Sequence, residues 1–186
     1  MALITYADKS TMNVNSNVPN TNKGRADDWN EIKSVVNGNW KQKDIITIKL
    51  DSDFTISSTN TITQITGFSV EEQIGNNLSL ASDKIVIGAG VKKVLVSYTA
   101  KHLNTTSTTR SFSYLQLNGT SCSQEAAFFP ATNSQITVSL QPQLFQVQQN
   151  DSFSLVVYGQ QGNKIGGAAA WRITSMTVEV VQYSDK

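Results

Sequence analysis

The stretch Ser134-Gln135-Ile136-Thr137-Val138-Ser139-Leu140 decides the fold class of this chain. Apolar residues stand at every second position, and polar residues fill the positions between them. Successive side chains of a β-strand point to opposite faces, so this alternation predicts a half-buried strand of an antiparallel sheet.

The same period of two recurs from Asp44 onward. It is clear in Ile46–Leu50, Lys93–Thr99 and Phe153–Val157, and the dipeptide Asn118-Gly119 is a strong signal for a hairpin turn that needs positive φ. Further short strands are expected at Phe54–Ile56, Thr61–Ile65, Leu78–Leu80, Lys84–Ile87 and Ser111–Leu117. Many short strands separated by turn signals, with no helical pattern among them, predict an all-β antiparallel jelly-roll sandwich over residues 44–186.

The last predicted strand, Ala170–Tyr183, changes the phase of its apolar positions. Trp171 and Ile173 are odd-numbered, whereas Met176 and Val178 are even-numbered. A slip of one residue moves side chains to the other face, so we expect a β-bulge near Thr174-Ser175.

The composition points to a surface of hydroxyls and amides. Ser, Thr, Asn and Gln make up 70 of the 186 residues, only 16% are charged, and the formal net charge is +1. With no cluster of Lys and Arg, nucleic acid is not an expected partner. No apolar run reaches the ~18 residues of a membrane span, so membrane insertion is not expected either. The first residues lack a secretory pattern, which leaves lysis or carriage aboard a particle as the expected way out of a host cell.

Residues 1–43 differ from the β region. Residues 13–22 are rich in Asn and predict an extended segment, either a disordered tail or a strap that orders against a partner. Ala26–Asn37 then places Trp29, Ile32 and Val36 on one helical stripe. A helix of about three turns is marginal alone in water, so its stripe should dock on its own β domain or on another chain.

Residues with catalytic potential are few. His102 is the only histidine and falls in a predicted exposed loop, Lys101–Arg110, while Cys122 is interpreted as a small packing residue. Glu71-Glu72 would point to opposite faces of a strand, and Asp51-Ser52-Asp53 lacks the remaining ligands of a calcium loop. We therefore expect no enzyme activity, no cofactor and no metal.

Aromatic residues on the predicted strands are interpreted as packing between subunits. Several strands carry apolar side chains on both faces, whereas a single sandwich buries one face of each sheet. Identical copies around a closed ring would cover the second face. The residues expected at this homotrimer interface are Tyr98, Phe112, Tyr114, Tyr158 and Tyr183. The alternative use of such rings, and of Trp40 and Trp171, is to stack on sugars.

Two parts of the sequence resemble known families. Ile4–Lys9, Asn20–Lys23 and Ala26–Asn37 resemble the opening segment of structural proteins of tailed bacteriophages, which implies that residues 1–43 attach to another virion protein of the capsid, the portal region or the baseplate. The β region is similar to the tumour-necrosis-factor-like jelly roll of the complement globular-head type, whose members are compact homotrimers. The matching stretches are Asn77–Leu80, Lys84–Ile87, Gly90–Val96, Leu117–Gly119, Val147–Leu155 and Thr174–Val181.

Together these resemblances imply a homotrimeric phage fibre or spike protein at the virion surface. Its head would bind a host-surface glycan through polar loops, Lys101–Arg110 and Gln160–Ala168. A head fibre or decoration protein with no dedicated receptor is the alternative. A polysaccharide depolymerase is a further alternative, and it would need two carboxylates about 5–10 Å apart. A bacterial adhesin is the remaining alternative, and the absent secretory signal weakens it.

Overall fold

The computed structural model describes residues 43–105, 110–123, 126–128, 131–167 and 173–184, all of which belong to one compact unit, Lys43–Lys186. The predicted helix with Trp29, Ile32 and Val36 lies outside the described residues, as do the extended segment and Trp171. The boundary at residue 43 thus stays a prediction. The described residues form strands and turns, without a helix.

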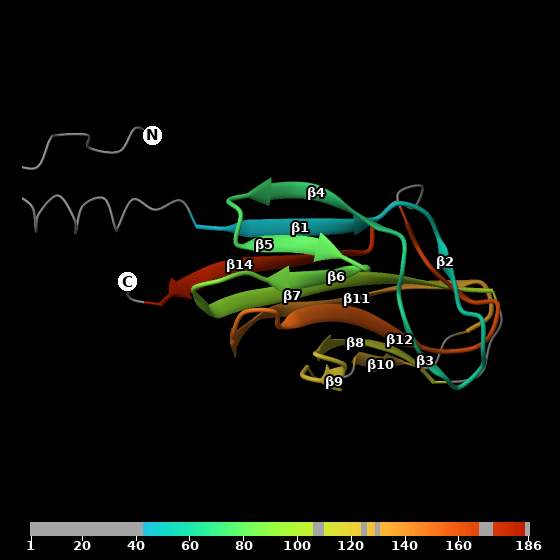
Figure 1. Ribbon diagram of the computed structural model, residues 1–186. Helices are drawn as coiled ribbons and strands as arrows, with labels where there is room; N and C mark the ends of the chain where they lie inside the picture. Colours follow the sequence, from blue (N-terminus) through green and yellow to red (C-terminus); the bar gives the residue numbers. More distant parts are fainter. Residues whose placement is uncertain (1–42, 106–109, 124–125, 129–130, 168–172, 185–186) are drawn as a thin grey trace, which may run out of the picture. The chain divides into compact units, whose positions relative to one another are not determined.

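Two antiparallel sheets form the sandwich (Figure 1). The first sheet has the order β2-β13-β7-β14-β1-β4, and β11 pairs with the other edge of β7. Its strands are β1 (Ile45–Leu50), β2 (Phe54–Thr55), β4 (Phe68–Ile74), β7 (Val91–Asn104), β11 (Ser134–Gln146), β13 (Lys164–Ile165) and β14 (Ser175–Tyr183).

The second sheet has the order β10-β8-β12-β6-β5, with β3 paired to β12 and β9 paired to β8. Its strands are β3 (Ile62–Gln64), β5 (Leu78–Ala81), β6 (Lys84–Ile87), β8 (Ser111–Leu117), β9 (Thr120–Ser121), β10 (Ala126–Phe128) and β12 (Ser152–Tyr158). The predicted all-β antiparallel jelly-roll sandwich is confirmed.

The core lies between the sheets and follows the predicted alternation. On the first sheet, every second residue of β1, β7 and β14 is buried, for example Ile46, Val96 and Val178 at 0% exposure. The second sheet contributes Leu155 and Phe153, also fully buried. Burial of such side chains gives about 1.5–3 kcal/mol each relative to exposure, which makes this layer the main stabilising element of the fold.

Two details of the register differ from, or refine, the sequence expectation. The phase change in β14 lies at Val181, where the pairing with β7 shifts, and not near Thr174-Ser175, because the strand begins only at Ser175. In β11 the register shifts between Leu140 and Gln143. Pro142 stands in this irregular stretch of an edge strand, where its missing N–H removes no ladder hydrogen bond.

The sandwich has two ends, which hold different connections of the chain. At the base end, β1 begins and β14 finishes, so the chain enters and leaves the unit there (Figure 1). At the distal end, β7 finishes and β8 begins, and the short strands β2 and β13 lie beside them. Residues that follow these strands therefore gather at the end opposite the point of chain entry.

Candidate functional site

The distal end gathers the polar connections of the β unit. We use the name distal loops for residues 51–61, residues 159–163, and Thr105 and Arg110 of the β7–β8 connection. Their exposed side chains are mostly hydroxyls and amides, with few charges. Exposed members are Asp51, Ser52, Asp53, Thr55, Ser57, Ser58, Thr59, Asn60, Thr61, Thr105, Arg110 and Gln161. The predicted loop Lys101–Arg110 is shorter than expected, because β7 continues to Asn104.

Buried asparagines hold the distal loops in place. The Asn163 side chain is 1% exposed, and its Oδ1 accepts a 3.0 Å hydrogen bond from the Thr105 backbone N–H. Its Nδ2 donates to Oδ1 of Asn104 at 3.3 Å, and Asn104 donates in turn to the Ser134 hydroxyl at 3.2 Å. Because a buried amide must keep its partners, this network fixes the β7–β8 and β12–β13 connections against each other.

Backbone contacts add residues 51–61 to this arrangement. Ile56 donates its N–H to the Asn163 carbonyl at 2.8 Å and accepts from Gly162 N–H at 2.9 Å. Gly167 N–H donates to Oδ1 of Asp53 at 3.0 Å, and a Cβ at Gly167 would stand 2.3 Å from the Ser52 carbonyl carbon. The close approach therefore requires glycine at 167, and the exposed side chains are presented on a rigid base.

His102 lies inside the sandwich and not in an exposed loop as predicted. It is 1% exposed, with Nδ1 3.1 Å from Ser111 Oγ and Nε2 3.3 Å from Ser113 Oγ. The Ser111 hydroxyl also lies 3.1 Å from the Tyr158 carbonyl, to which it can donate. Burial lowers the pKa of His102 to about 4. The imidazole is thus neutral near pH 7 and links the two sheets.

Three of the aromatic residues predicted at the trimer interface form a cluster of their own. Phe112, Tyr114 and Tyr158 pack with Val156 on the face of the second sheet that points away from the core. The rings of Phe112 and Tyr158 stack with centroids 4.6 Å apart, and the Arg110 guanidinium lies 5.0 Å from the Phe112 centroid. Phe112 and Tyr114 are only 6% and 4% exposed. The single chain therefore already covers most of the surface that the pattern had assigned to other subunits.

Tyr98 is a core residue. It is 3% exposed between the sheets, and its hydroxyl donates a 2.7 Å hydrogen bond to the Ser113 carbonyl, with burial raising its pKa. Almost none of its surface is left for another subunit, so the interface assignment of Tyr98 is corrected. The apolar residues at every second position of β7 predicted an interface between subunits. In the structure, that face of β7 packs against the second sheet of the same chain.

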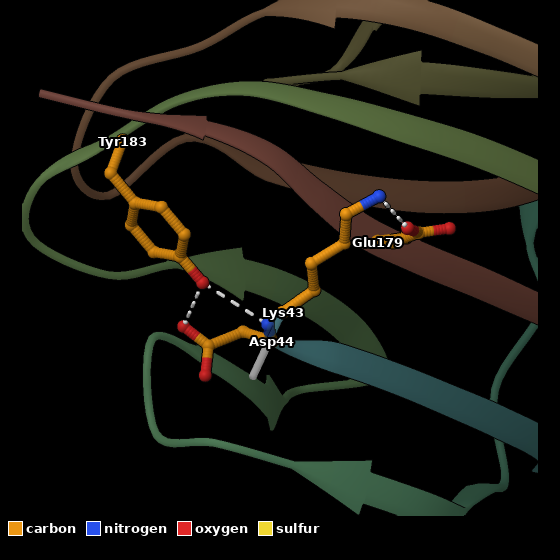
Figure 2. Close-up of polar contacts among 4 residues, drawn as sticks. All are labelled: Lys43, Asp44, Glu179 and Tyr183. Atoms are coloured by element: carbon orange, nitrogen blue, oxygen red, sulfur yellow. Dashed lines mark hydrogen bonds and ion pairs between the residues drawn. The ribbon is translucent and has the colours of Figure 1, made fainter. Parts of the chain in front are cut away.

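Tyr183 lies at the base end, where it meets the residue at which the chain enters (Figure 2). Its hydroxyl donates to Oδ2 of Asp44 at 2.9 Å and accepts from Asp44 N–H at 3.1 Å. Asn77 Nδ2 donates to the same carboxylate oxygen at 2.6 Å. Beside them Lys43 Nζ contacts Glu179 Oε1 at 3.0 Å. These contacts tie residues 43 and 44 to the last strand.

The outward face of the first sheet carries a patch of short hydroxyl side chains on β1, β7, β11 and β14. Hydroxyls pair across strands, Thr47 with Thr177 at 3.0 Å and Thr99 with Ser139 at 3.2 Å. A hollow of about 350 Å³ lies at the irregular stretch of β11, next to these pairs. Toward the base end, Leu144 is 58% exposed and pairs with Leu95. This face, and not the aromatic cluster, offers apolar surface to a second copy.

The remaining chemical groups show no catalytic arrangement in the described part of the chain. Burial raises the pKa of the Cys122 thiol to about 11, so it is protonated at neutral pH. Glu71 contacts Lys49 at 3.7 Å, and Asp51 accepts from the Ser69 hydroxyl at 2.5 Å. Among residues 43–184, apart from the gaps given above, no group of three or more His, Cys, Asp or Glu could hold a metal ion. Nor does that part contain a helix with the length and apolar character to span a bilayer.

Comparison with solved structures identifies the fold. Three crystal structures of mouse APRIL are similar to this chain: at pH 5.0 with a TM-score of 0.60 and 8% identity, at pH 8.0 with 0.55 and 8%, and at pH 8.5 with 0.54 and 10%. Each match covers 75% of this chain and 100% of the other. The fold is a TNF-like jelly roll.

The sequence itself gives no closer relative. Neither a protein-family model nor a curated protein matches it. At identities of 8–10% the likeness to APRIL shows the TNF-like jelly roll alone, and function must be argued from the surface of this chain.

Proposed function

We propose that this protein is a non-enzymatic component of a tailed-phage virion surface, a homotrimeric fibre or spike whose TNF-like head binds a host-surface glycan. Residues 1–43 attach it to another virion protein. The observation that carries the proposal is the arrangement of the two ends of the head: the chain enters at the base end, and a rigid polar rim stands at the distal end.

The chemistry of the distal loops suits a polyhydroxylated ligand. Their exposed hydroxyls and amides can each donate and accept hydrogen bonds, as sugar hydroxyls do. The buried Asn104–Asn163 network and the Gly167 contact hold these groups in fixed positions, which lowers the entropy lost on binding. Single sites of this kind are weak. Three on one head, repeated around a particle, raise avidity by about 10²–10⁴.

Trimer formation is supported by the fold and by one exposed patch. The TNF-like family to which the sequence is similar consists of compact homotrimers. On this chain, the outward face of the first sheet carries a patch of short hydroxyl side chains and the pair Leu95 and Leu144. Short side chains lose little rotamer freedom when they become buried, so this face can pack against a copy at low entropic cost.

The test uses the full chain and a form lacking residues 1–42. We expect both to sediment at about three times the mass of their own chain, 20.3 kDa for the full chain. We expect the shortened form to bind host cells but not to assemble onto particles. Sedimentation of both as monomers, or a shortened form that still joins particles, would contradict the proposal. Particle assembly without any binding of the head to host surfaces would favour the head fibre or decoration protein.

A further inference from the structure

The turn Asn118-Gly119 joins β8 to β9 at the base end, and both of its residues are exposed. A Cβ added at Gly119 would meet no atom within 4 Å, so the space beside this glycine is open. When glycine follows asparagine, its backbone nitrogen can approach the asparagine side-chain amide carbon closely, because glycine has no side chain to obstruct the approach. The turn therefore places a reactive pair of groups where water can reach them.

The Asn118 carboxamide also holds the turn to the start of β12. Its Nδ2 donates to Oδ1 of Asp151 at 2.7 Å, and its Oδ1 accepts from the Ser152 N–H at 2.9 Å. Asp151 is 8% exposed, and its Oδ2 accepts from the Gln148 N–H at 2.8 Å. The Asp151 carbonyl accepts from the Ile87 N–H at 2.8 Å. Asn118 and Asp151 together thus connect the β8–β9 and β11–β12 turns to the end of β6.

We propose that Asn118 is a deamidation site, and that its conversion to a carboxylate breaks this connection. The Gly119 backbone nitrogen attacks Asn118 Cγ and gives its proton to water or hydroxide. The Cγ–Nδ2 bond breaks, and the side-chain nitrogen takes a proton from water and leaves as ammonia. Water then hydrolyses the cyclic imide at either carbonyl, which leaves an aspartate or an isoaspartate at position 118. The proposal does not depend on the phage assignment.

The product destabilises the contact that the amide made. A carboxylate oxygen replaces Nδ2, the donor that stands 2.7 Å from the Asp151 carboxylate, so two like charges face each other without a proton between them. Asp151 is held in place by the Gln148 N–H and has little exposed surface. An isoaspartate also adds a backbone methylene to a two-residue turn. Modified chains therefore have a less stable base end of the second sheet.

Peptide mapping by mass spectrometry measures the reaction in the full-length protein at mildly alkaline pH. Asn133 is the internal control, because it is exposed with φ of 57°, like Asn118 with φ of 53°, but precedes Ser134. We expect modification at position 118 to be at least about tenfold faster than at position 133 in the native protein. Concentrated urea should accelerate it further, because the hydrogen bonds to Asp151 and Ser152 then no longer restrain the amide. Equal rates at the two positions in the native protein, or a rate at position 118 that urea does not raise, would overturn the proposal.

An exchange of donor and acceptor tests the consequence. Asn118→Asp reproduces the product and should lower the folding equilibrium constant by about tenfold or more at pH 7, as measured by urea denaturation. Asn118→Asp combined with Asp151→Asn restores a donor opposite the new carboxylate and keeps an acceptor for the Gln148 N–H, so it should fold within about threefold of the wild type. Asn133→Asp adds the same charge at an exposed turn and should also stay within about threefold. If Asn118→Asp behaves like Asn133→Asp, or if the exchanged pair does not recover, the proposed consequence is wrong.

Discussion

The Tyr183 hydroxyl donates to the Asp44 carboxylate at 2.9 Å and accepts from the Asp44 backbone N–H at 3.1 Å. The end of β14 thus holds the residue that directly precedes β1. Asp44 is 4% exposed, and only Tyr183 and Asn77 are seen to donate side-chain hydrogen bonds to it among the described residues.

Tyr183→Phe should lower the free energy of unfolding by about 1–3 kcal/mol, because a buried carboxylate loses one of its donors. Urea denaturation at pH 7 measures the change. The control is Lys43→Ala, which removes the neighbouring ion pair to Glu179 on the surface, where such pairs contribute only about 0–1 kcal/mol. Equal effects of the two substitutions would show that the Tyr183–Asp44 contact does not stabilise the base end.

His102 should make the protein sensitive to acid. Its pKa is about 4 in the folded protein, against 6.5 for an unperturbed histidine, so the unfolded state binds the proton more tightly. Stability is then full above pH 6.5 and falls as the pH drops toward 4. The loss should reach roughly 2 kcal/mol at pH 5 and roughly 3 kcal/mol below pH 4.

Urea titrations of the wild type and His102→Gln from pH 7.5 to 4 isolate this effect, since carboxylates contribute equally to both proteins. The difference between the two curves should shrink or reverse over the predicted window. Parallel curves would mean that His102 titrates with an ordinary pKa and is not buried as described.

The regular strands could be predicted from sequence because one physical rule fixes them. The period of two in Ile46–Leu50 and Phe153–Val157 reports a single buried face, and both stretches are strands of the sandwich. The turn after β8 could also be predicted from the sequence. Asn118 and Gly119 have φ of 53° and 80°, the positive values that the dipeptide predicts.

The buried polar residues of β7 could not be predicted in the same way. In β7 the inward face continues from Tyr98 through Ala100 to His102 and Asn104, but its last members are polar and break the hydrophobic period. Their partners, Ser111 and Asn163, belong to β8 and to the β12–β13 connection. Only the fold shows that each buried polar group finds its hydrogen bond.

The residues predicted at the trimer interface present a related case. Apolar residues on both faces of β8 and β12 show that both faces are covered, but the pattern does not say by what. Phe112, Tyr114 and Val156 are buried in the single chain, so their apolar surface does not need a second copy to cover it. The support for a trimer comes instead from the TNF-like fold and from the exposed side chain of Leu144.

Leu144→Glu should convert the proposed trimer to monomers, because a carboxylate cannot be buried against Leu95 of the sheet face without a partner. Ile62→Glu is the matched control, since Ile62 is 51% exposed on the second sheet and Leu144 is 58% exposed on the first. Analytical ultracentrifugation should give about one chain mass for Leu144→Glu and three for Ile62→Glu. Dissociation by Ile62→Glu alone would move the interface to the second sheet.

If the proposed glycan site is correct, Gln161→Arg should weaken attachment to host cells by tenfold or more, because the longer side chain on the distal rim holds the ligand away from the neighbouring hydroxyls and amides. The Gln161 backbone N–H keeps its 3.2 Å hydrogen bond to Thr59 in this variant, so the loop should hold its shape. Gln149→Arg makes the same change at an exposed position in the β11–β12 turn of the base end. Cell-binding curves of the two trimers measure the contrast, and stronger loss from Gln149→Arg would show that the receptor contacts the base end.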